Sequence, residues 1–297
     1  MMNTEYVVRG KNLRKKFKGF HLEIDDLKIP KGFATALIGE NGAGKTTLLN
    51  MMAGIRLDFK GNFTYFEKEN DIDANDIKER IGYTGPNSYF LPHWTIQQIR
   101  EIGELLFEHF DPYKFDLICN SLCIPVENAK NVKSLSDGNR MKLMLATVLA
   151  RETELLILDE PASPLDPLMR DRLCEIIRHY ISEGEGERSV FFSTHNITDM
   201  ENVTDYAIIM EEGKVVEEGF VEDLKEKYIM VKGEIEDYDL ASKVLMGMNK
   251  NKYGFEGLCL TDKLDQLAGA NLAYETPTLS QICIGVMKEY TSLKITF

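Results

Sequence analysis

The chain has 297 residues, of which 43% are hydrophobic and 28% are charged, and its formal net charge is −13. This length and composition predict a folded protein with room for one large domain, or for one large and one small domain. The acidic balance argues against general nucleic-acid binding, which needs a basic face, and leaves open a local basic patch.

The sequence shows no pattern typical of membrane spans or secretion. No apolar stretch approaches the roughly 20 residues that cross a bilayer, and the first residues lack the basic and apolar regions of a signal peptide. The five cysteines, at positions 119, 123, 174, 259 and 283, have no paired C-x-x-C spacing. We therefore expect a cytosolic protein with reduced, buried thiols, whose membrane-spanning part, if any, is another chain.

In chain order, the first elements are strands that lead to a glycine-rich loop. Residues 6–10 and 20–24 alternate apolar and polar side chains, as in an antiparallel edge sheet. The apolar run 34–38 is typical of a buried parallel strand, and residues 46–53, which end at Gly54, are typical of a helix. The loop between them lies where a strand passes into a helix.

This loop fits the phosphate-binding pattern G-x-x-x-x-G-K-[ST]. Its residues are Gly39, Glu40, Asn41, Gly42, Ala43, Gly44, Lys45, Thr46 and Thr47. Glycines let the backbone curl so that successive N–H groups point at phosphate oxygens, and the helix N-terminus adds the positive end of its dipole. The order of strand, loop and helix predicts a nucleotide site; the alternative is a glycine turn that merely caps a helix.

The following segments predict helices and then a hairpin. Apolar side chains recur at helical spacing from residue 95 to about residue 134, at Ile96, Ile99, Ile102, Leu105, Leu106 and Phe110. Residues 208–219 are typical of a β-hairpin that turns at Gly213. Beyond about residue 223 there is no nucleotide motif, yet the apolar residues suffice for a small α+β fold.

Two further buried-strand patterns end in polar residues. Residues 155–158 lead into Asp159 and Glu160, and residues 190–194 lead into His195. Adjacent residues of a strand point to opposite sides, so we expect the two carboxylates to have different roles. The remaining histidines lie in no motif and are expected to be structural: His21, His93, His109 and His179.

Residues 135–139, with the sequence Leu-Ser-Asp-Gly-Asn, resemble the signature motif of the ABC transporter ATPases. The family pattern is L-S-G-G-Q, so Ser136 and Gly138 match it, whereas Asp137 and Asn139 depart from it.

Three other segments resemble motifs of the same family. They are residues 155–160 for the Walker B motif, residues 161–167 for the D-loop, and His195 for the switch histidine. Each motif is weak alone, but all stand in the family's order over residues 35–195. The chain is therefore identified as a member of the ATP-binding subunits of ABC transporters.

The resemblance implies an α/β fold with a P-loop NTPase core, in which a mixed sheet is joined by an antiparallel edge sheet. Residues 1–222 are expected to form the ABC ATPase domain, with a helical subdomain at about 87–150. Residues 223–297 are expected to form a small α+β accessory domain that packs against the ATPase core and tunes dimerisation or partner docking. The alternative is a packing extension without a regulatory role.

The same resemblance implies roles in ATP hydrolysis for the loop and for the strand ends. Lys45 is expected to reach the β- and γ-phosphates, and Thr46 to offer its hydroxyl to Mg²⁺. Asp159 is suited to hold Mg²⁺ through water, and Glu160 to accept the proton of the attacking water. His195 is expected to hydrogen-bond the γ-phosphate and that water.

The remaining site residues are implied to act at the edges of the nucleotide. Phe17 falls where the family stacks an aromatic ring on adenine; the alternative is a core or surface phenylalanine. Ser136 and the Gly138 backbone would contact the γ-phosphate held by an opposing subunit, with Asp166 at the same interface. Two cassettes would then sandwich two ATP molecules, and ATP would favour the closed dimer.

One loop departs from the family. After the strand predicted at residues 80–83, where the family carries a glutamine or an acidic residue, this chain has Pro86 and Asn87. Asn87 is expected to touch Mg²⁺ or the attacking water, whereas Pro86 has no donor and fixes the chain.

Residues 276–282 resemble the P-T-L-E-D-I segment of bacterial ATPases that export antibiotics, multidrug substrates or peptides. We therefore expect an ATPase at the inner face of the cell membrane that powers a separate transmembrane permease subunit and pairs with a second ATPase subunit, without nucleic acid. The alternative is a soluble ABC ATPase that acts on nucleic acid, ribosomes or cluster assembly.

Overall fold

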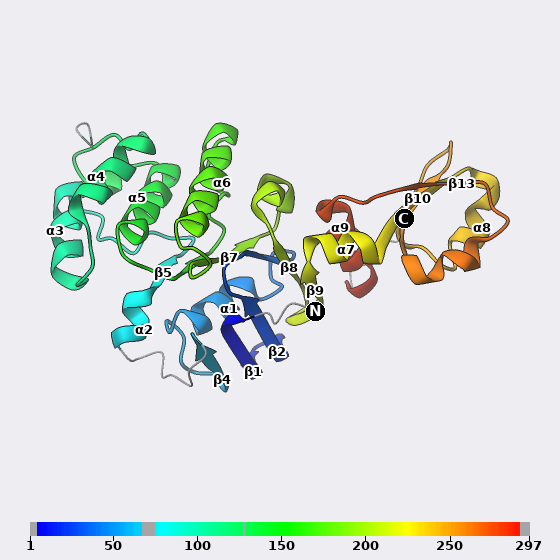
Figure 1. The fold of residues 1–297 in the computed structure, drawn as a ribbon, viewed down its shortest axis with the longest axis horizontal. Helices are drawn as coiled ribbons and strands as arrows, with labels where there is room; N and C mark the ends of the chain where they lie inside the picture. Colours follow the sequence, from blue (N-terminus) through cyan, green and yellow to red (C-terminus); the bar gives the residue numbers. More distant parts are fainter. Residues whose placement is uncertain (1–4, 67–74, 127–128, 292–297) are drawn as a thin grey trace.

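A computed structural model describes residues 5–66, 75–126 and 129–291, and Figure 1 shows its ribbon. Its centre is a six-stranded sheet with the order β5-β6-β7-β3-β8-β9, parallel except for the antiparallel pair of β8 and β9. The strands are β3 (Ala34–Ile38), β5 (Ile81–Thr84), β6 (Leu155–Leu158), β7 (Ser189–Thr194), β8 (Tyr206–Glu211) and β9 (Lys214–Phe220). The predicted hairpin is thus the pair β8 and β9, which turns at Glu212 and Gly213, both with positive φ.

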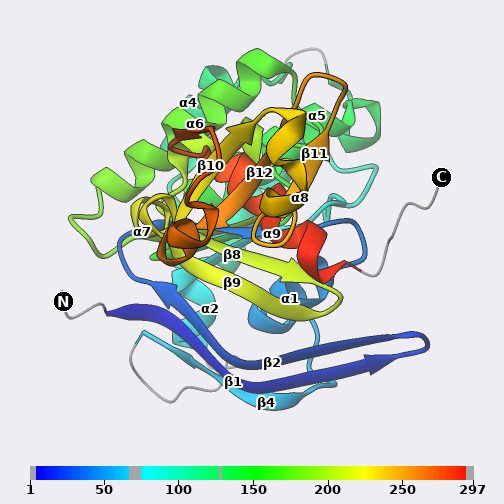
Figure 2. The same ribbon diagram turned by 90° about the vertical axis from the view of Figure 1, so that its right-hand side faces the viewer.

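A second, three-stranded antiparallel sheet has the order β2-β1-β4. Its strands are β1 (Tyr6–Phe17), β2 (Phe20–Pro30) and β4 (Lys60–Tyr65), and Figure 2 shows them as a layer below the six-stranded sheet. Apolar side chains of this layer share one core with helix α1 (Lys45–Met52) and with strands β3, β6 and β7. The predicted antiparallel edge sheet is confirmed, and the core beneath it fixes the start of α1.

Helices cover the other face of the six-stranded sheet. They are α3 (Ile96–Leu106), α4 (Pro112–Ser121), α5 (Asp137–Leu149) and α6 (Pro167–Ser182), with the short 3-10 helices η1 (Val132–Ser134), η2 (Ile197–Asp199) and η3 (Glu201–Val203). Helix α2 (Asn75–Arg80) lies on the face of α1 instead, because its Ile77 belongs to the core shared with the three-stranded sheet. Several begin at a side-chain cap, such as Thr95 for α3 and Asp111 for α4, where Pro112 takes the first helical position. These caps explain why the helical pattern divides at residues 107–111.

The prediction that the apolar side chains of residues 95–110 form one buried helical face is wrong at the end of α3. Ile96, Ile99 and Gly103 are buried on α3, but Leu105 is 82% exposed and Leu106 is 63% exposed. The Phe110 ring packs against Gly103 so closely that an added Cβ would lie 2.6 Å from it. Because this ring fills the space beside Gly103, the last turn of α3 points its leucines outward.

The C-terminal part contains a four-stranded antiparallel sheet with the order β11-β12-β10-β13. Its elements are α7 (Val221–Lys227), β10 (Tyr228–Gly233), η4 (Ile235–Asp237), α8 (Tyr238–Ala241), β11 (Met246–Lys250), β12 (Phe255–Leu260), η5 (Thr261–Leu267), β13 (Leu272–Glu275) and α9 (Leu279–Tyr290). This is the α+β unit that the sequence predicts, although the predicted boundary at residues 222 and 223 falls inside α7.

Helix α9 joins this C-terminal sheet to the ATPase core. Leu279, Ile282, Cys283 and Val286 belong to the same hydrophobic core as β7, β8 and η3 of the ATPase domain. Figure 1 shows α9 and α7 between the two parts. The C-terminal sheet keeps a small core of its own on its other face. The expectation that this part packs against the ATPase core is therefore confirmed.

Four of the cysteines are buried and unpaired, but Cys123 is exposed, because it follows α4 in a turn with φ 52°. The prediction of buried thiols is wrong at this position. Within the described ranges, the structure contains no helix with the length and apolar character that a membrane span requires.

Candidate nucleotide-binding and hydrolysis site

The glycine loop, residues 39–47, passes from the end of β3 into the start of α1. Gly44 has φ 104° and is the N-cap of α1, and Gly42 has φ 94°; both are left-handed conformations that glycine adopts without strain. At Gly39 a Cβ would lie 2.4 Å from the Met210 carbonyl oxygen of β8. The glycines therefore permit the curled backbone and the close approach that the loop needs.

Lys45 is the first residue of α1, and its side chain is 6% exposed. Its Nζ donates to the carbonyl oxygens of Gly39, at 2.7 Å, and of Glu40, at 3.1 Å, and lies 3.5 Å from Glu160 Oε1. These partners hold a buried ammonium group inside the curve of its own loop, where it can neutralise phosphate charge.

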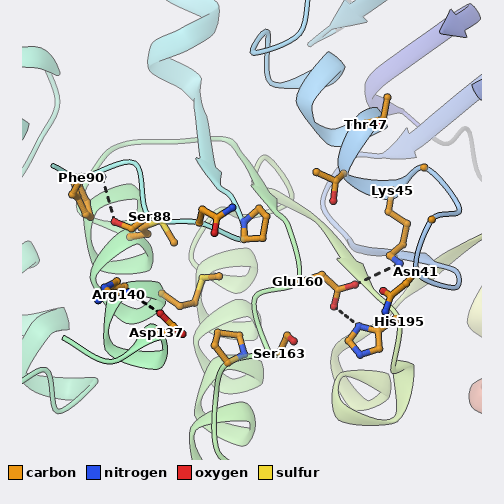
Figure 3. Close-up of a pocket in the computed structure, with 18 of the residues that line it drawn as sticks. Asn41, Lys45, Thr47, Ser88, Phe90, Asp137, Arg140, Glu160, Ser163 and His195 are labelled. Atoms are coloured by element: carbon orange, nitrogen blue, oxygen red, sulfur yellow. Dashed lines mark hydrogen bonds and ion pairs between the residues drawn. The ribbon is translucent and has the colours of Figure 1, made fainter. Parts of the chain in front are cut away.

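The loop opens onto a cleft with a volume of about 1090 Å³. Residues from both the sheet and the helical side line it: Phe17, Phe20, Asn41, Gly42, Gly44, Lys45, Thr46, Thr47, Pro86, Asn87, Ser88, Phe90, Pro92, Val132, Lys133, Asp137, Arg140, Met141, Met144, Glu160, Ser163, Pro164 and His195. Figure 3 shows Lys45, Glu160 and His195 together on one side, which we call the phosphate wall. Asp137 and Arg140 lie across the cleft.

Glu160 is the centre of the phosphate wall. Its Oε2 lies 2.8 Å from His195 Nδ1, and its side chain is 19% exposed, compared with 43% for His195. Its backbone has φ 51°, a left-handed conformation that is strained for a residue with a side chain. The structure thus brings together Lys45, Glu160 and His195, the three residues that the sequence predicted to be catalytic.

Asp159, directly before Glu160, has 0% exposure. Its Oδ1 accepts a hydrogen bond of 2.5 Å from the Ser193 hydroxyl, and its Oδ2 has no hydrogen-bond partner among the described residues. Burial raises the pKa of the Asp159 carboxyl, against the lowering effect of the Ser193 and Thr46 hydroxyls.

This donor set fits Mg²⁺. Asp159 Oδ2 is a buried carboxylate oxygen without a hydrogen-bond partner among the described residues, and the Thr46 hydroxyl acts on the same carboxyl group, so the two residues supply the hard oxygen ligands that Mg²⁺ prefers. No cluster of three or more histidine, cysteine or acidic residues suited to a metal occurs in residues 5–66, 75–126 and 129–291. A site with few protein ligands is the type that Mg²⁺ uses beside a nucleotide.

The two carboxylates differ for a reason other than strand alternation. Strand β6 ends at Leu158, so neither Asp159 nor Glu160 belongs to it. The left-handed backbone of Glu160 turns its side chain to the cleft, whereas Asp159 stays buried against Ser193. The sequence patterns predicted no role for Ser193, although a polar residue at the end of an apolar strand marks its position.

The signature segment, residues 135–139, begins helix α5. The Ser136 hydroxyl caps this helix by accepting a hydrogen bond from the Asn139 N–H at 3.3 Å. At Gly138 a Cβ would lie 2.8 Å from the Pro164 carbonyl oxygen, so the helix start packs tightly on the D-loop. Among the contacts of the described residues, none links Ser136 or Gly138 to Lys45.

Arg140, for which the sequence patterns predicted no role, forms an ion pair of 2.7 Å with Asp137. Its guanidinium also donates to the carbonyl oxygens of Val132, at 3.2 Å, and Lys133, at 3.1 Å. The sequence does hold a clue to this ion pair, because a cationic residue three positions after an acidic one lies beside it on a helix.

The other predicted site residues lie at the edges. The ring of Phe17, 36% exposed, lines the cleft with Lys15 Nζ and the Arg56 guanidinium carbon each 5.3 Å from its centroid. Asn87, in the loop between β5 and α3, also lines the cleft. Asp166 is exposed and caps α6 by accepting a hydrogen bond from the Met169 N–H, at 3.1 Å.

Comparison with known proteins supports the motif assignment. Residues 22–163 match the family model described as "ABC transporter". An uncharacterized ABC transporter ATP-binding protein of Nostoc sp. is 30% identical over 91% of this chain and 84% of its own length.

Relatives with stated transport roles differ in direction. The bacitracin transport ATP-binding protein BcrA of Enterococcus faecalis is 28% identical over 82% of this chain and 80% of its own length. The molybdenum import ATP-binding protein ModC of Vibrio parahaemolyticus is 28% identical over 69% of this chain and 56% of its own length.

Among solved structures, a dimeric bacterial ABC transporter cassette has a TM-score of 0.62 at 22% identity, covering 72% of this chain and 98% of that chain. This likeness confirms the predicted fold class. The chain belongs to the ABC transporter family, as an ATP-binding subunit that hydrolyses ATP with Mg²⁺ as the usual partner ion.

Proposed function

We propose that this chain powers the export of peptides, antibiotics or other amphiphiles through a separate transmembrane subunit, with its ATP hydrolysed at the phosphate wall. The main support for this hydrolysis site is that Glu160 contacts both Lys45 and His195 beside the glycine loop. These groups are what phosphoryl transfer to water requires: charge neutralisation and a positioned base.

Glu160 is the general base in this proposal. Its carboxylate faces the cleft between the Lys45 ammonium and the His195 ring, where it can accept the proton of a water that attacks the γ-phosphate. His195 holds one oxygen of that carboxylate and orients it. Lys45, buried in the loop, neutralises phosphate charge where water is partly excluded.

Thr46 and Asp159 would hold Mg²⁺, which neutralises charge on the phosphate oxygens when it is bound. The Asp159 Oδ2 atom is oriented for this by the hydrogen bond that engages Oδ1.

The nucleotide's other contacts come from the edges and from a second subunit. Phe17 offers an exposed ring to adenine. Ser136 and Gly138 stand at the exposed start of α5, so they contact the ATP bound to an opposing cassette. Asp166 lies close to the interface between the two cassettes. Two cassettes therefore close on two ATP molecules, and hydrolysis lets them reopen.

Export is favoured by the extent of the match to BcrA. That match covers 82% of this chain and 80% of BcrA, whereas the ModC match covers 69% of this chain and 56% of ModC. The segment 276–282, which resembles an exporter motif, forms a capping box at Thr278 and Gln281 and starts α9. The chain lies at the inner face of the membrane against its permease subunit.

The test begins with capture of the tagged Glu160→Gln chain from detergent-solubilised membranes, with ATP, and identification of the co-purifying integral protein. Cells that express the chain with this protein are then challenged with bacitracin and related amphipathic peptides, and Lys45→Ala is the matched inactive control. Lower accumulation that depends on Lys45 supports export. A Lys45-dependent rise in cellular molybdenum, or capture of ribosomes or nucleic acid in place of a membrane protein, overturns it.

A further inference from the structure

Ser193 lies between the two carboxylates that the proposed hydrolysis site uses in different ways. It belongs to β7, which pairs in parallel with β6 on one side and β3 on the other. Leu158, the last residue of β6, pairs with Phe192, so Ser193 stands level with the start of the Asp159–Glu160 pair. Its side chain is fully buried.

The Ser193 hydroxyl makes two hydrogen bonds. It accepts one of 2.9 Å from the Glu160 backbone N–H and donates one of 2.5 Å to Asp159 Oδ1. A hydroxyl has a single proton, and a backbone N–H can only donate. The direction of both bonds is therefore fixed, and the proton of Ser193 is committed to Asp159.

Each bond constrains one carboxylate. The bond from the Glu160 N–H holds a backbone with φ 51°, which carries the Glu160 side chain to Lys45 and His195. The bond to Asp159 engages Oδ1 and leaves Oδ2 as the buried oxygen without a partner among the described residues. One hydroxyl thus orients a base and a metal-facing oxygen together.

We propose that Ser193 is a positioning residue that gives adjacent carboxylates their separate tasks: it presents Asp159 Oδ2 to the divalent cation and holds Glu160 in its left-handed conformation at the phosphate wall. This rests on the proposed roles of Asp159 and Glu160, and Ser193 itself touches neither nucleotide nor metal.

The same strand offers a matched control. Ser189, at the start of β7, is also fully buried, and its hydroxyl accepts a backbone hydrogen bond of 2.9 Å, from the Gly32 N–H. Ser189→Ala removes a buried hydroxyl and leaves one N–H without its partner, as Ser193→Ala does. It differs in having no carboxylate beside it among the contacts that the structure shows.

The experiment compares Ser193→Ala and Ser189→Ala by Mn²⁺ binding in the presence of ADP, measured by electron paramagnetic resonance, and by steady-state ATPase kinetics. We expect Ser193→Ala to weaken Mn²⁺ binding and to lower kcat, each by about 10- to 100-fold, as for other residues that orient a metal ligand. ADP affinity measured in EDTA stays unchanged. Ser189→Ala lowers the melting temperature to a similar extent and leaves Mn²⁺ affinity and kcat near the wild type.

A rescue variant separates position from packing. Ser193→Thr keeps the hydroxyl, so it recovers Mn²⁺ affinity relative to Ser193→Ala even if the extra methyl group lowers stability. If Ser193→Ala is too unstable to purify, Ser193→Cys supplies the comparison, because a thiol is a weak donor and acceptor of nearly the same shape.

Equal Mn²⁺ affinity and equal kcat in Ser193→Ala and Ser189→Ala would overturn the proposal and leave Ser193 a structural residue. If the proposed hydrolysis site itself is wrong, the result differs. In that case Glu160→Gln hydrolyses ATP at the wild-type rate, and Asp159→Asn binds Mn²⁺ like the wild type, whatever the Ser193 variants do.

Discussion

The two sides of the nucleotide cleft are built in different ways. On the phosphate wall, Lys45 is buried and contacts Glu160, which also contacts His195. On the other side, which we call the signature wall and define as residues 136–140, the Asp137 side chain is 85% exposed, and its ion pair with Arg140 stays within its own helix. The first wall is assembled by this chain alone, whereas the side-chain hydrogen bonds that the structure shows for the second stay within residues 132–140.

The two walls suit different steps, hydrolysis on the phosphate wall and contact between subunits on the signature wall. A buried, connected set of charges is preorganised and keeps its geometry without a partner. An exposed helix start gains its role when another molecule covers it. We therefore expect changes on the phosphate wall to alter the chemistry of each subunit, and changes on the signature wall to alter the encounter between subunits.

The largest effect is expected for Glu160→Gln, which keeps the shape of the side chain and removes the base. Turnover of ATP should fall by at least about 100-fold, since a positioned general base contributes roughly 10²–10⁴-fold. ATP binding should persist and trap a dimer, detectable by size-exclusion chromatography with ATP. Glu187→Gln, an exposed carboxylate paired with Lys31, is the matched control. Wild-type turnover in Glu160→Gln would mean that the base lies elsewhere.

Next in size is Lys45→Ala, which removes the ammonium group from the glycine loop. Hydrogen bonds to charged groups contribute about 1.5–3 kcal/mol, so ATP affinity measured by calorimetry should fall by about 10- to 100-fold. Folding should survive. Lys31→Ala, in the turn before β3 and so at the opposite end of that strand from the glycine loop, should bind ATP like the wild type. Unchanged affinity in Lys45→Ala would contradict the assignment of the loop.

A smaller effect is expected for Arg140→Ala, which leaves the Asp137 charge unbalanced on the signature wall. Exposed ion pairs contribute about 0.2–1 kcal/mol, so the ATP-dependent dimer should dissociate roughly two- to fivefold more readily. The measurement is sedimentation equilibrium in the Glu160→Gln background.

The double change Asp137→Asn with Arg140→Ala should recover dimerisation, because no uncompensated charge remains. ATP affinity of the monomer should stay constant in both variants. A change in the ATP affinity of the monomer would instead show that the signature wall takes part in nucleotide binding within its own chain.

Sequence patterns predicted the phosphate wall well because its parts are local. The glycine loop needs left-handed glycines at fixed positions, and the buried strands need continuous apolar runs, so both leave a direct record in the sequence. Lys45, Asp159, Glu160 and His195 follow these elements at their ends. Their convergence follows from parallel strands that end at one edge of a sheet.

Features set by long-range packing were missed. Leu105 and Leu106 fit a helical apolar stripe, but the Phe110 ring takes the space beside Gly103 and leaves them exposed. The role proposed for the Ser193 hydroxyl depends on its hydrogen bonds to Asp159 and Glu160, which lie 34 and 33 positions away in the chain. Periodicity within one segment carries no information on such contacts.

The smallest effect concerns the support of the phosphate wall from the C-terminal part. Helix η2 follows His195 by one residue, and η3 then offers Glu201 Oε1 to the backbone N–H of Leu279, at 2.8 Å, at the start of α9. A carboxylate at a helix N-terminus contributes about 0.3–1 kcal/mol. Glu201→Gln keeps an oxygen acceptor and removes the charge, so the melting temperature should fall slightly.

Because Glu201→Gln leaves Lys45, Glu160 and His195 in place, kcat should stay within about twofold of the wild type, a difference of roughly 0.4 kcal/mol in the barrier. Glu222→Gln, an exposed carboxylate in the first turn of α7, is the matched control for loss of one charge near a helix start. A fall in kcat well beyond that, with ATP affinity intact, would show that α9 holds the segment after His195 in its working position. The C-terminal part would then regulate hydrolysis, and the phosphate wall would no longer be complete within the ATPase domain.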